Sequence, residues 1–523
     1  LSPLSPLSPL SPLSPLSPPS AHQQAQTSAI PLPSPHPQPT SDLVPGAEGP
    51  QAPDRQVGLP TFSLTKSGID HFIPRGLRLL ACAYIPIPYI MCLMKTSFRI
   101  LGGNPISGQL QPMGNKNAAL PMLASCLLTD EPVLLHNLPD ILDVRVMLEG
   151  LQSLNVDVEW IQPKSVRLHA GSKIQNCVSE EICQRVRTSI LFAGPLLART
   201  GAVTLSPPGG DVIGRRRLDP HFTGLRALGV EIHVNHTFEF KAAKRLNGQR
   251  IFLDEASVTA TENLLMAAAT ADGTTTIINA ACEPHVQDLC RLLNKMGAQI
   301  SGIGTNRLTI EGVEKLHGTE HEICPDHIEI GSFVALSAIS GGELEVQGVV
   351  EEDMWMIRHT FAKVGINFSI DGTTLTLPRH GTLEVQPDIG NIIPTIDDGP
   401  WPQFPSDLMS PLIVAATQAK GPILFHEKMF ESRMFFIDRL VSMGAGIILC
   451  DPHRCVVTGT AQLHMANLTS PDIRAGMAIL MAALVAEGES IIQNADMIDR
   501  GYEQVDHKLR ALGADIERIS PCC

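Results

Sequence analysis

The stretch 207–217 combines residue types that suit proton transfer beside an anion. It runs Pro-Pro-Gly-Gly-Asp-Val-Ile-Gly-Arg-Arg-Arg, so Asp211 stands at the tip of a glycine-rich loop and three consecutive arginines follow. Adjacent glycines allow backbone paths that are closed to other residues. Guanidinium groups match the geometry of phosphates and carboxylates. The pattern favours an anionic substrate next to a proton-handling carboxyl; the alternative is an ordinary surface loop that carries arginines by chance.

Two further segments place a cation beside the start of an expected helix. Residues 114–121, Gly-Asn-Lys-Asn-Ala-Ala-Leu-Pro, follow a strand-like segment and open a helix rich in Ala and Leu. Backbone N–H groups at a helix N-terminus, with Lys116 beside them, attract anions; the alternative is a capped helix with a solvated lysine. Arg187 precedes the apolar residues 191–197, where it either clamps a diphosphate or extends to solvent.

Residues 402–409 present a carboxylate on a stiffened turn. Pro402 and Pro405 restrict the backbone, and Asp407 stands at the expected start of the next helix. A carboxylate held rigidly in a cleft can act as a general base. The alternative is an aspartate that caps the helix N-terminus.

The C-terminal part of the chain supplies three more arginines at matching places. Arg433, Arg474 and Arg500 each lie before or at the start of an expected helix, and Asp472 accompanies Arg474. Repeated loops that point toward one cleft would bring these guanidinium groups together. Three arginines at matched positions favour an anion site over three separate structural roles.

The unit that positions these residues recurs along the chain at intervals of roughly 70 residues. In each copy a helix-like segment ends at a Gly or Asn, which tolerate the left-handed conformation that terminates a helix. A strand-like segment with alternating or β-branched residues follows at once. The six terminating residues are Asn155, Gly229, Gly297, Gly365, Gly444 and Gly513.

The repeat predicts an α/β fold with helices at its centre. Each unit holds about two helices and three or four strands, so six units suggest two domains of three units each. Residues 475–486 are apolar around the whole helix, which predicts a buried helix with sheets packed outside it. We expect the active site in the cleft between the two domains.

Together, in this order, the motifs resemble the enolpyruvyl transferases that act on UDP-N-acetylglucosamine. The resemblance covers residues 94–520; shikimate-pathway transferases are less similar because their phosphate loop has Gly-Ser-Lys-Ser where this chain has Gly-Asn-Lys-Asn. The segments that carry the resemblance are 114–121, 187–195, 209–221, 404–409, 430–434 and 499–512.

This resemblance implies a fold and a reaction. The fold is two inside-out α/β barrel domains, each of three βαβαββ-like repeats. We expect one lobe to comprise residues 94–115 and 326–523, and the other residues 116–325 with a lid loop at 207–219. The reaction transfers the enolpyruvyl group of phosphoenolpyruvate to the 3′-hydroxyl of UDP-N-acetylglucosamine and releases phosphate, the first committed step of peptidoglycan precursor synthesis. The alternatives are another acceptor, or a non-catalytic paralogue that binds the nucleotide sugar.

The resemblance also implies roles for individual residues, with neither a metal nor a cofactor. Asp407 would take the proton of the 3′-hydroxyl. The residues implied in catalysis are Asp211, Asp407, Lys116 and Arg500. Those implied in binding phosphoenolpyruvate are Lys116, Asn117, Arg216, Arg433, Arg474 and Arg500. Those implied in binding the nucleotide sugar are Arg187, Arg216, Arg217, Leu218, Asp219, Pro220, Ser257, Val258, Asp407 and Met429.

Four positions depart from the common pattern of the family. Asp211 stands where most members have the Cys that protonates the enolpyruvyl methylene. An aspartate has a reference pKa of about 3.9, which anionic substrate would raise and the neighbouring arginines would lower. We expect activity to be retained and the chain to be insensitive to fosfomycin, which alkylates the thiolate. Glu255, Thr259 and His285 replace the usual Lys, Gly and Glu near the nucleotide.

Composition limits the partners. The net charge of −14 argues against nucleic acid as a main partner, because phosphate backbones require a basic face. Hydrophobic residues make up 43% of the chain and aromatic residues only 4%, so aliphatic side chains must build the cores. The 12 cysteines include no Cys-x-x-Cys pair and no metal-type spacing, which is typical of unpaired thiols in a reducing cytoplasm.

The N-terminal residues 1–93 differ from the rest. Six copies of Leu-Ser-Pro and a Pro/Ser/Gln-rich stretch predict a disordered extension. The apolar residues 79–93 resemble a signal peptide or membrane anchor, but they are short for a span and contain Pro86 and Pro88. We expect Met94 to be the start of the ordered protein, in the cytoplasm, with small-molecule substrates as partners and without stable membrane association.

Overall fold

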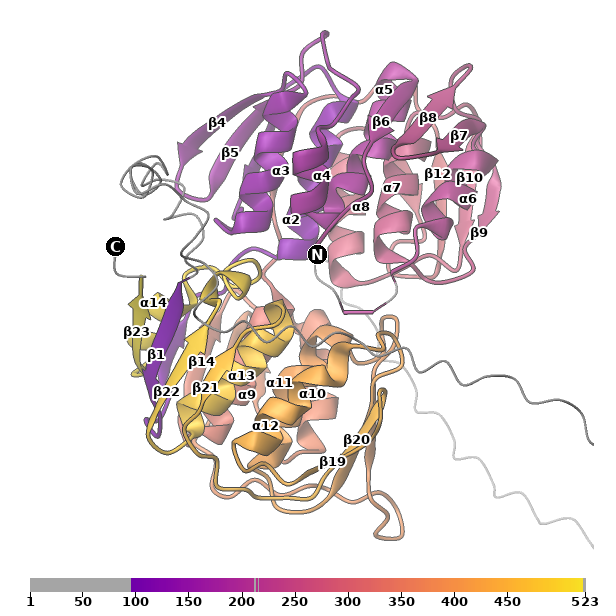
Figure 1. Cartoon of the computed structure of the whole chain (residues 1–523). Helices are drawn as coiled ribbons and strands as arrows, with labels where there is room; N and C mark the ends of the chain where they lie inside the picture. The colour runs from indigo at the N-terminus through magenta and orange to yellow at the C-terminus, as the bar shows by residue number, and fades with distance from the viewer. Residues whose placement is uncertain (1–95, 211–212, 215, 521–523) are drawn as a thin grey trace, which may run out of the picture. The chain divides into compact units, whose positions relative to one another are not determined.

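A computed structural model describes residues 96–210, 213–214 and 216–520 of the chain. The predicted N-terminal extension and Asp211 lie outside the described residues. The described residues group as one compact unit. Within it the buried side chains form two hydrophobic clusters, one from residues 113–323 and one from residues 98–110 and 328–516. We call the parts built on these clusters the N-lobe and the C-lobe (Figure 1).

Among the described residues, each lobe contains three helices at its centre, with three more farther out in the C-lobe and four in the N-lobe. The central helices of the N-lobe are α2 (Lys116–Ser125), α5 (Ala193–Thr200) and α7 (Val258–Ala268), and those of the C-lobe are α9 (His327–Ile339), α11 (Ser406–Thr417) and α13 (Ile473–Val485). The others are α3 (Leu142–Ser153), α6 (Asp219–Ala227), α8 (Pro284–Lys295), α10 (Glu351–Ala362), α12 (Ile437–Ser442) and α14 (Val505–Ala511), with a short α4 (Glu180–Arg185). In α13 every residue except Val485 is buried, as its apolar sequence predicts.

The described residues of each lobe form three small sheets. In the N-lobe the strand orders are β13(Thr319–Glu322)-β3(Val133–His136)-β5(Ser165–His169)-β4(Asp157–Gln162), β11(Gln299–Ser301)-β12(Arg307–Glu311)-β10(Thr274–Ile278)-β9(Arg250–Phe252) and β6(Ala202–Leu205)-β8(Phe238–Ala242)-β7(Val230–Val234). In the C-lobe they are β21(Asn467–Thr469)-β22(Glu489–Gln493)-β1(Ser97–Leu101)-β23(Asp515–Ile519), β15(Ser369–Asp371)-β16(Thr374–Leu377)-β14(Leu344–Gln347)-β2(Gly108–Leu110) and β17(Thr395–Asp397)-β18(Ile423–His426)-β20(Arg454–Val457)-β19(Ile447–Asp451).

The sheets share one topology, as expected for a repeated unit. Each four-stranded sheet combines one parallel pair with two antiparallel pairs; in the first sheet β13–β3 is parallel and β3–β5 and β5–β4 are antiparallel. The three-stranded sheet has only a single parallel bridge, Cys177–Thr204, in place of its parallel strand. Strands such as β10 alternate buried and exposed residues, so one face covers the central helices and the other faces solvent. The predicted inside-out α/β fold is confirmed.

The six helix-terminating positions behave as the repeat predicts. All have positive φ, from 66° at Asn155 to 102° at Gly297 and Gly513, and the other three glycines lie between these values. This left-handed conformation lets the chain leave the helix and enter the next strand directly. The eight cysteines in the described part of the chain are unpaired, as expected.

The chain crosses between the lobes in two adjacent segments. Asn115 N donates to Cys324 O at 2.7 Å, and Asp326 N donates to Met113 O at 2.9 Å. A side chain at Gly114 would collide with the carbonyl of Asn137, so only glycine fits this crossing. The paired crossings place the start of α2 beside the start of α9, where the two lobes meet.

Candidate active site

Asp407 lies between two arginines of the C-lobe. Its Oδ1 is 2.8 Å from Nη2 of Arg433, and its Oδ2 is 2.8 Å from Nη2 of Arg474. The capping position of α11 is Pro405, and Asp407 stands in the first turn. The alternative of an aspartate at the N-cap is therefore wrong, because both carboxylate oxygens face guanidinium groups instead of the helix terminus.

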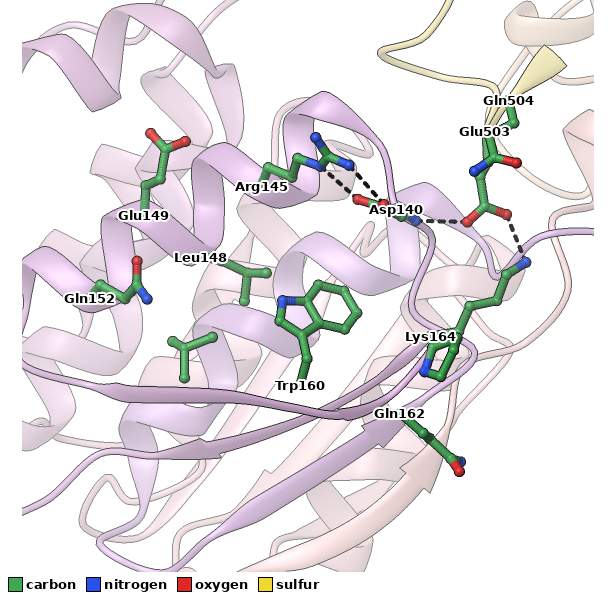
Figure 2. Close-up of a pocket in the computed structure, with 12 residues that line it drawn as sticks. Asp140, Arg145, Leu148, Glu149, Gln152, Trp160, Gln162, Lys164, Glu503 and Gln504 are labelled. Carbon is green, nitrogen blue, oxygen red and sulfur yellow. Dashed lines mark hydrogen bonds and ion pairs between the residues drawn. The ribbon is translucent and has the colours of Figure 1, made fainter. Parts of the chain in front are cut away.

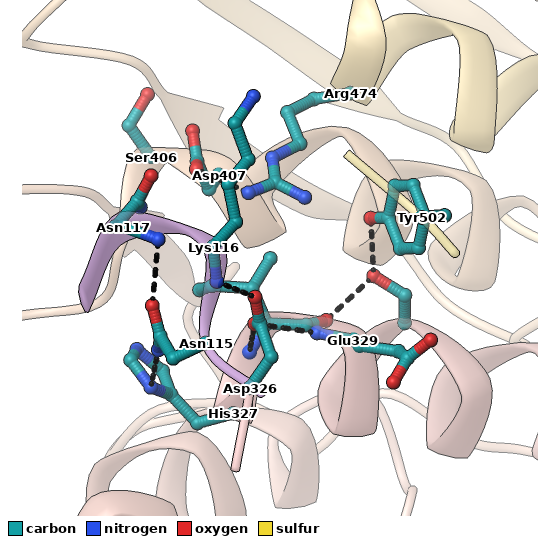
Figure 3. Close-up of polar contacts among 12 residues, drawn as sticks. Asn115, Lys116, Asn117, Asp326, His327, Glu329, Ser406, Asp407, Arg474 and Tyr502 are labelled. Carbon is teal, nitrogen blue, oxygen red and sulfur yellow. Dashed lines mark hydrogen bonds and ion pairs between the residues drawn. The ribbon is translucent and has the colours of Figure 1, made fainter. Parts of the chain in front are cut away.

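The charges around Asp407 keep it ionised. Burial of the carboxyl would raise its pKa, but Arg474 and Arg433, with a contribution from Lys116, outweigh burial and hold the pKa well below its usual range. Figure 3 shows Lys116 and Arg474 beside Asp407. Three predicted site residues from distant parts of the sequence thus surround one carboxylate.

The two arginines are themselves held in place. Arg433 begins a short 3-10 helix, η3 (Arg433–Phe436), and its Nε donates to Ser406 Oγ at 3.3 Å. The Ser406 hydroxyl in turn donates to the buried Glu427 carboxyl at 2.9 Å. Burial and the neighbouring Asp398 raise the pKa of Glu427, so this carboxyl favours its protonated form. Sequence reasoning missed Glu427, although it singled out Met429 and the segment 430–434 close by, because no pattern in the sequence shows that this carboxyl is buried against Ser406.

Arg474 offers an unused donor at the site. Its guanidinium carbon lies 5.3 Å from the centre of the Tyr502 ring, and the backbone around it is fixed because Asp472 caps α13 and accepts from Arg474 N at 2.9 Å. Its Nη1 is buried and has no hydrogen-bond partner among the described residues. A buried donor of this kind is costly unless a ligand completes it. Arg474 therefore retains one donor beyond the nitrogen that faces Asp407.

A second carboxylate, Asp143, joins Lys116 to Arg500. Asp143 lies in the first turn of α3; its Oδ2 is 2.8 Å from Lys116 Nζ and its Oδ1 is 2.8 Å from Arg500 Nε. Burial would raise its pKa, but the two cations outweigh burial and lower it. Sequence reasoning missed Asp143 because an acid in the first turn of a helix is commonplace.

The N-terminus of α2 is capped, as one of the two sequence interpretations expects, but its lysine is buried. Its N–H groups are already occupied: Asn115 Oδ1 accepts from Asn117 N at 2.9 Å and Ala118 N at 3.1 Å, and Asp326 Oδ2 accepts from Lys116 N at 3.2 Å. The expected anion site on these backbone groups is therefore wrong. The solvated-lysine alternative is also wrong, since Lys116 is only 7% exposed.

A second group of predicted residues gathers in the N-lobe. Nη2 of Arg187 donates to Arg216 O at 2.7 Å. Burial, with the charge of Arg216, lowers the pKa of Arg187 to about 10, and Glu255 acts in the opposite direction. Ser257 caps α7, accepting from Ala260 N at 3.4 Å, and Val258 is the first residue of the helix. Arg187 therefore lies within reach of the charges of Arg216 and Glu255.

Thr259, one of the departures, has a defined partner. Its Oγ1 is 3.0 Å from Nε2 of the buried His221, whose Nδ1 lies 3.1 Å from Asn263 Nδ2. Burial and the charge of Arg187 lower the pKa of His221 to about 3, so the ring is neutral. The threonine hydroxyl is thus engaged within the lobe.

The remaining predicted residues lie along the lid loop and nearby. Arg217 and Asp219 form an exposed ion pair of 3.3 Å, Leu218 and Pro220 begin α6, and Met429 is 38% exposed. The described part of the loop 207–219 contacts the C-lobe where Ser432 N donates to Ile213 O at 3.2 Å, next to Arg433 in the sequence. The contacts of Arg216 group it with Arg187, whereas Lys116, Asp407, Arg433, Arg474 and Arg500 form the other group.

Comparisons with known proteins agree with this architecture. Residues 100–509 match the family model described as EPSP synthase (3-phosphoshikimate 1-carboxyvinyltransferase). The UDP-N-acetylglucosamine 1-carboxyvinyltransferase of Treponema denticola is 54% identical over 418 residues, which cover 80% of this chain and 98% of that protein. The enzyme of the same name from Bradyrhizobium diazoefficiens is 50% identical over 434 residues, or 83% of this chain and 98% of that one.

Solved structures show the same fold at lower identity. The enolpyruvyl transferase NikO from Streptomyces tendae superposes with a TM-score of 0.73 at 22% identity, covering 82% of this chain and all of that one. EPSP synthase from Acinetobacter baumannii gives a TM-score of 0.64 at 17% identity, covering 81% of this chain and all of that one. None of the helices in the described residues combines the length and hydrophobicity that a membrane crossing needs.

Proposed function

The chain belongs to the EPSP synthase family and, within it, to the UDP-N-acetylglucosamine 1-carboxyvinyltransferases, and from this premise we propose how its residues carry out the reaction. The protein transfers the enolpyruvyl group of phosphoenolpyruvate to the 3′-hydroxyl of UDP-N-acetylglucosamine and releases phosphate. Its substrates are small anionic molecules, and the step supplies peptidoglycan precursor synthesis. We further propose that it works in the cytoplasm.

The observation that carries the assignment of the site is the position of Asp407 between two buried guanidinium groups. Phosphoenolpyruvate brings a phosphate and a carboxylate, which match Arg433, Arg474 and the cation Lys116. As the sugar oxygen attacks C2 of the enolpyruvyl group, Asp407 accepts the hydroxyl proton and Asp211 gives a proton to C3. The Asp211 carboxylate then takes a C3 proton back while the C2–O bond to phosphate breaks, which releases phosphate and restores the double bond.

Binding of the anionic substrate would itself activate Asp407. In the free protein the two arginines hold the pKa of this carboxyl low, which makes it a weak base. A bound phosphate or carboxylate shares these guanidinium groups and adds negative charge nearby, and both effects raise the pKa of Asp407. The base therefore becomes stronger only when phosphoenolpyruvate is present.

The nucleotide sugar belongs, in this proposal, to the group around Arg187, Arg216 and the start of α7. Support comes from the buried Arg187, which donates to the backbone carbonyl of Arg216 and feels the charge of its guanidinium, because two neighbouring cations suit a diphosphate. We also propose that the lobes divide between residues 115 and 116 and between residues 325 and 326, which the paired crossing segments and the two separate cores support.

A phosphate-release assay tests the proposed function. Purified full-length chain is incubated with phosphoenolpyruvate and either UDP-N-acetylglucosamine or shikimate 3-phosphate. We expect release only with the nucleotide sugar. Release with shikimate 3-phosphate alone, or no release with either acceptor, would contradict the proposal.

Fosfomycin tests the role of position 211. The native chain should keep its activity after incubation, because Asp211 offers no thiolate, whereas Asp211→Cys should lose activity with time. Inactivation of the native chain, with an adduct on the 207–219 loop, would show that another residue reacts.

A further inference from the structure

The segment 500–504 contacts the N-lobe at two places. The first is the ion pair between Arg500 and Asp143. The second is Glu503, whose Oε1 accepts from Asp140 N at 3.0 Å and whose Oε2 is 2.7 Å from Lys164 Nζ (Figure 2). Asp140 and Asp143 flank the start of α3, so both contacts reach the same part of the N-lobe.

Glu503 is buried, which a surface ion pair does not require. Its side chain is 7% exposed, and a carboxylate so enclosed is costly unless both oxygens are bonded. One oxygen is bonded by a backbone N–H and the other by an ammonium group, both from the N-lobe. Lys164 stands in the β4–β5 turn with φ of 61°, a conformation uncommon for lysine. The contact is therefore a specific connection between the lobes.

The same segment is fixed on its other side by the C-lobe. Tyr502 is fully buried, and its hydroxyl lies 2.9 Å from Ser332 Oγ in α9. A side chain at Gly501 would collide with Ile473 at the start of α13. Arg500 thus begins a short segment that is held by the C-lobe at Gly501 and Tyr502 and by the N-lobe at Glu503.

We propose that Glu503 is a positioning residue for the binding of phosphoenolpyruvate. By holding segment 500–504 against the N-lobe, it places Arg500 on Asp143 and so next to Lys116. This inference rests on the proposed function, which assigns Arg500 and Lys116 to that substrate. Loss of the Glu503 contacts leaves Tyr502 in place but frees the N-lobe side of the segment, so Arg500 meets the substrate less often in the productive position.

The surroundings limit the size of the effect. A cavity of about 660 Å³ adjoins the ion pair, lined by Leu148, Trp160 and Arg145 among others, and Lys164 is 40% exposed. Water therefore screens the ammonium group, and the Lys164–Glu503 attraction is moderate. We expect a change in substrate affinity without global unfolding.

The test compares Glu503→Gln, Lys164→Met and the double variant in the full-length chain. Each single variant should raise KM for phosphoenolpyruvate about threefold to tenfold, with KM for UDP-N-acetylglucosamine nearly unchanged. The melting temperature should stay nearly unchanged in Glu503→Gln and fall by a few degrees in Lys164→Met, which leaves one oxygen of the enclosed carboxylate without a partner. The double variant should resemble the singles, because both remove one ion pair. Lys315→Met is the matched control: this N-lobe lysine pairs at 2.9 Å with Asp130 of its own lobe, so its loss should leave both KM values unchanged.

Three results would overturn the proposal: an unchanged KM for phosphoenolpyruvate, an equal rise in both KM values with a lower melting temperature, or additive effects in the double variant. The dissociation constant of phosphoenolpyruvate, measured by calorimetry with the nucleotide sugar present, gives the same comparison if the native chain shows no turnover. Native turnover tests the proposed function, and the ratio of variant to native affinity tests the role of Glu503.

Discussion

Asp143 and Asp407 are two carboxylates with the same arrangement and different surroundings. Each has one oxygen 2.8 Å from one cation and the other oxygen 2.8 Å from a second cation. The cations of Asp143 come from the two different lobes, and its side chain is 6% exposed. Those of Asp407 both come from the C-lobe, and its side chain is 27% exposed. An enclosed carboxylate such as Asp143 holds its two cations in a fixed geometry, whereas a more exposed carboxylate such as Asp407 can also exchange a proton with a ligand.

The largest effect on the reaction rate should come from Asp407, the more exposed carboxylate. Asp407→Asn keeps the shape but cannot accept a proton, so we expect kcat to fall by about 10²- to 10⁴-fold. KM for phosphoenolpyruvate should stay within a few-fold, because Arg433 and Arg474 remain. Steady-state phosphate release measures both constants, and a variant with native kcat would remove Asp407 from the chemistry.

The enclosed carboxylate should affect binding and stability instead. Asp143→Asn leaves Lys116 and Arg500 without their shared counter-charge, and breaking a buried ion pair costs about 3–5 kcal/mol. We expect a lower free energy of unfolding in urea and a KM for phosphoenolpyruvate raised by about tenfold or more. Asp130→Asn, at the more exposed pair with Lys315, is the control and should change neither.

A smaller effect is the pH dependence of stability that comes from His285, a buried residue near Asp407. Burial, with the nearby His327, lowers the pKa of His285 to about 3, while Asp407 and Asp288 act in the opposite direction. His285 of the unfolded chain therefore binds a proton near pH 6.5, whereas His285 of the folded chain stays neutral. The free energy of unfolding is unaffected by His285 above that pH and decreases as pH falls below it. Between pH 7 and pH 5 the loss is about 2 kcal/mol.

The free energy of unfolding, measured in urea, should fall between pH 7 and pH 5 by about 2 kcal/mol less in His285→Gln than in the native chain. Equal pH dependence in the variant and the native chain would show that His285 is not held neutral. The comparison also probes how closed the region near Asp407 is, because a wet site would leave the histidine free to ionise.

The smallest effect tests the support of Arg474. Tyr502→Phe removes the hydroxyl, which contacts Ser332 and interacts with the Arg474 guanidinium group, but keeps the ring beneath that group. We expect a loss of about 1 kcal/mol in the free energy of unfolding and less than threefold change in kcat. A large loss of kcat would give the hydroxyl a role in the reaction.

The sequence predicted the repeats because each copy ends a helix at a residue suited to positive φ, a local property that Asn155 and Gly229 show directly. From the equivalent loops of the repeat it also predicted that Arg433, Arg474 and Arg500 would converge. The structure places the first two on Asp407 and Arg500 on Asp143. It did not predict Asp143 or Glu503. Their importance comes from partners more than 300 residues away in the sequence, which no local pattern reveals.

Phosphate release at saturating concentrations of both substrates, measured side by side for the native chain, Asp143→Asn and Asp407→Asn, tests the central distinction most directly. High substrate concentration compensates for weaker binding but cannot replace a missing base. We predict that Asp143→Asn recovers most of the native rate and that Asp407→Asn remains at least about a hundredfold slower. Equal rates for the two variants, or a faster Asp407→Asn, would contradict the account.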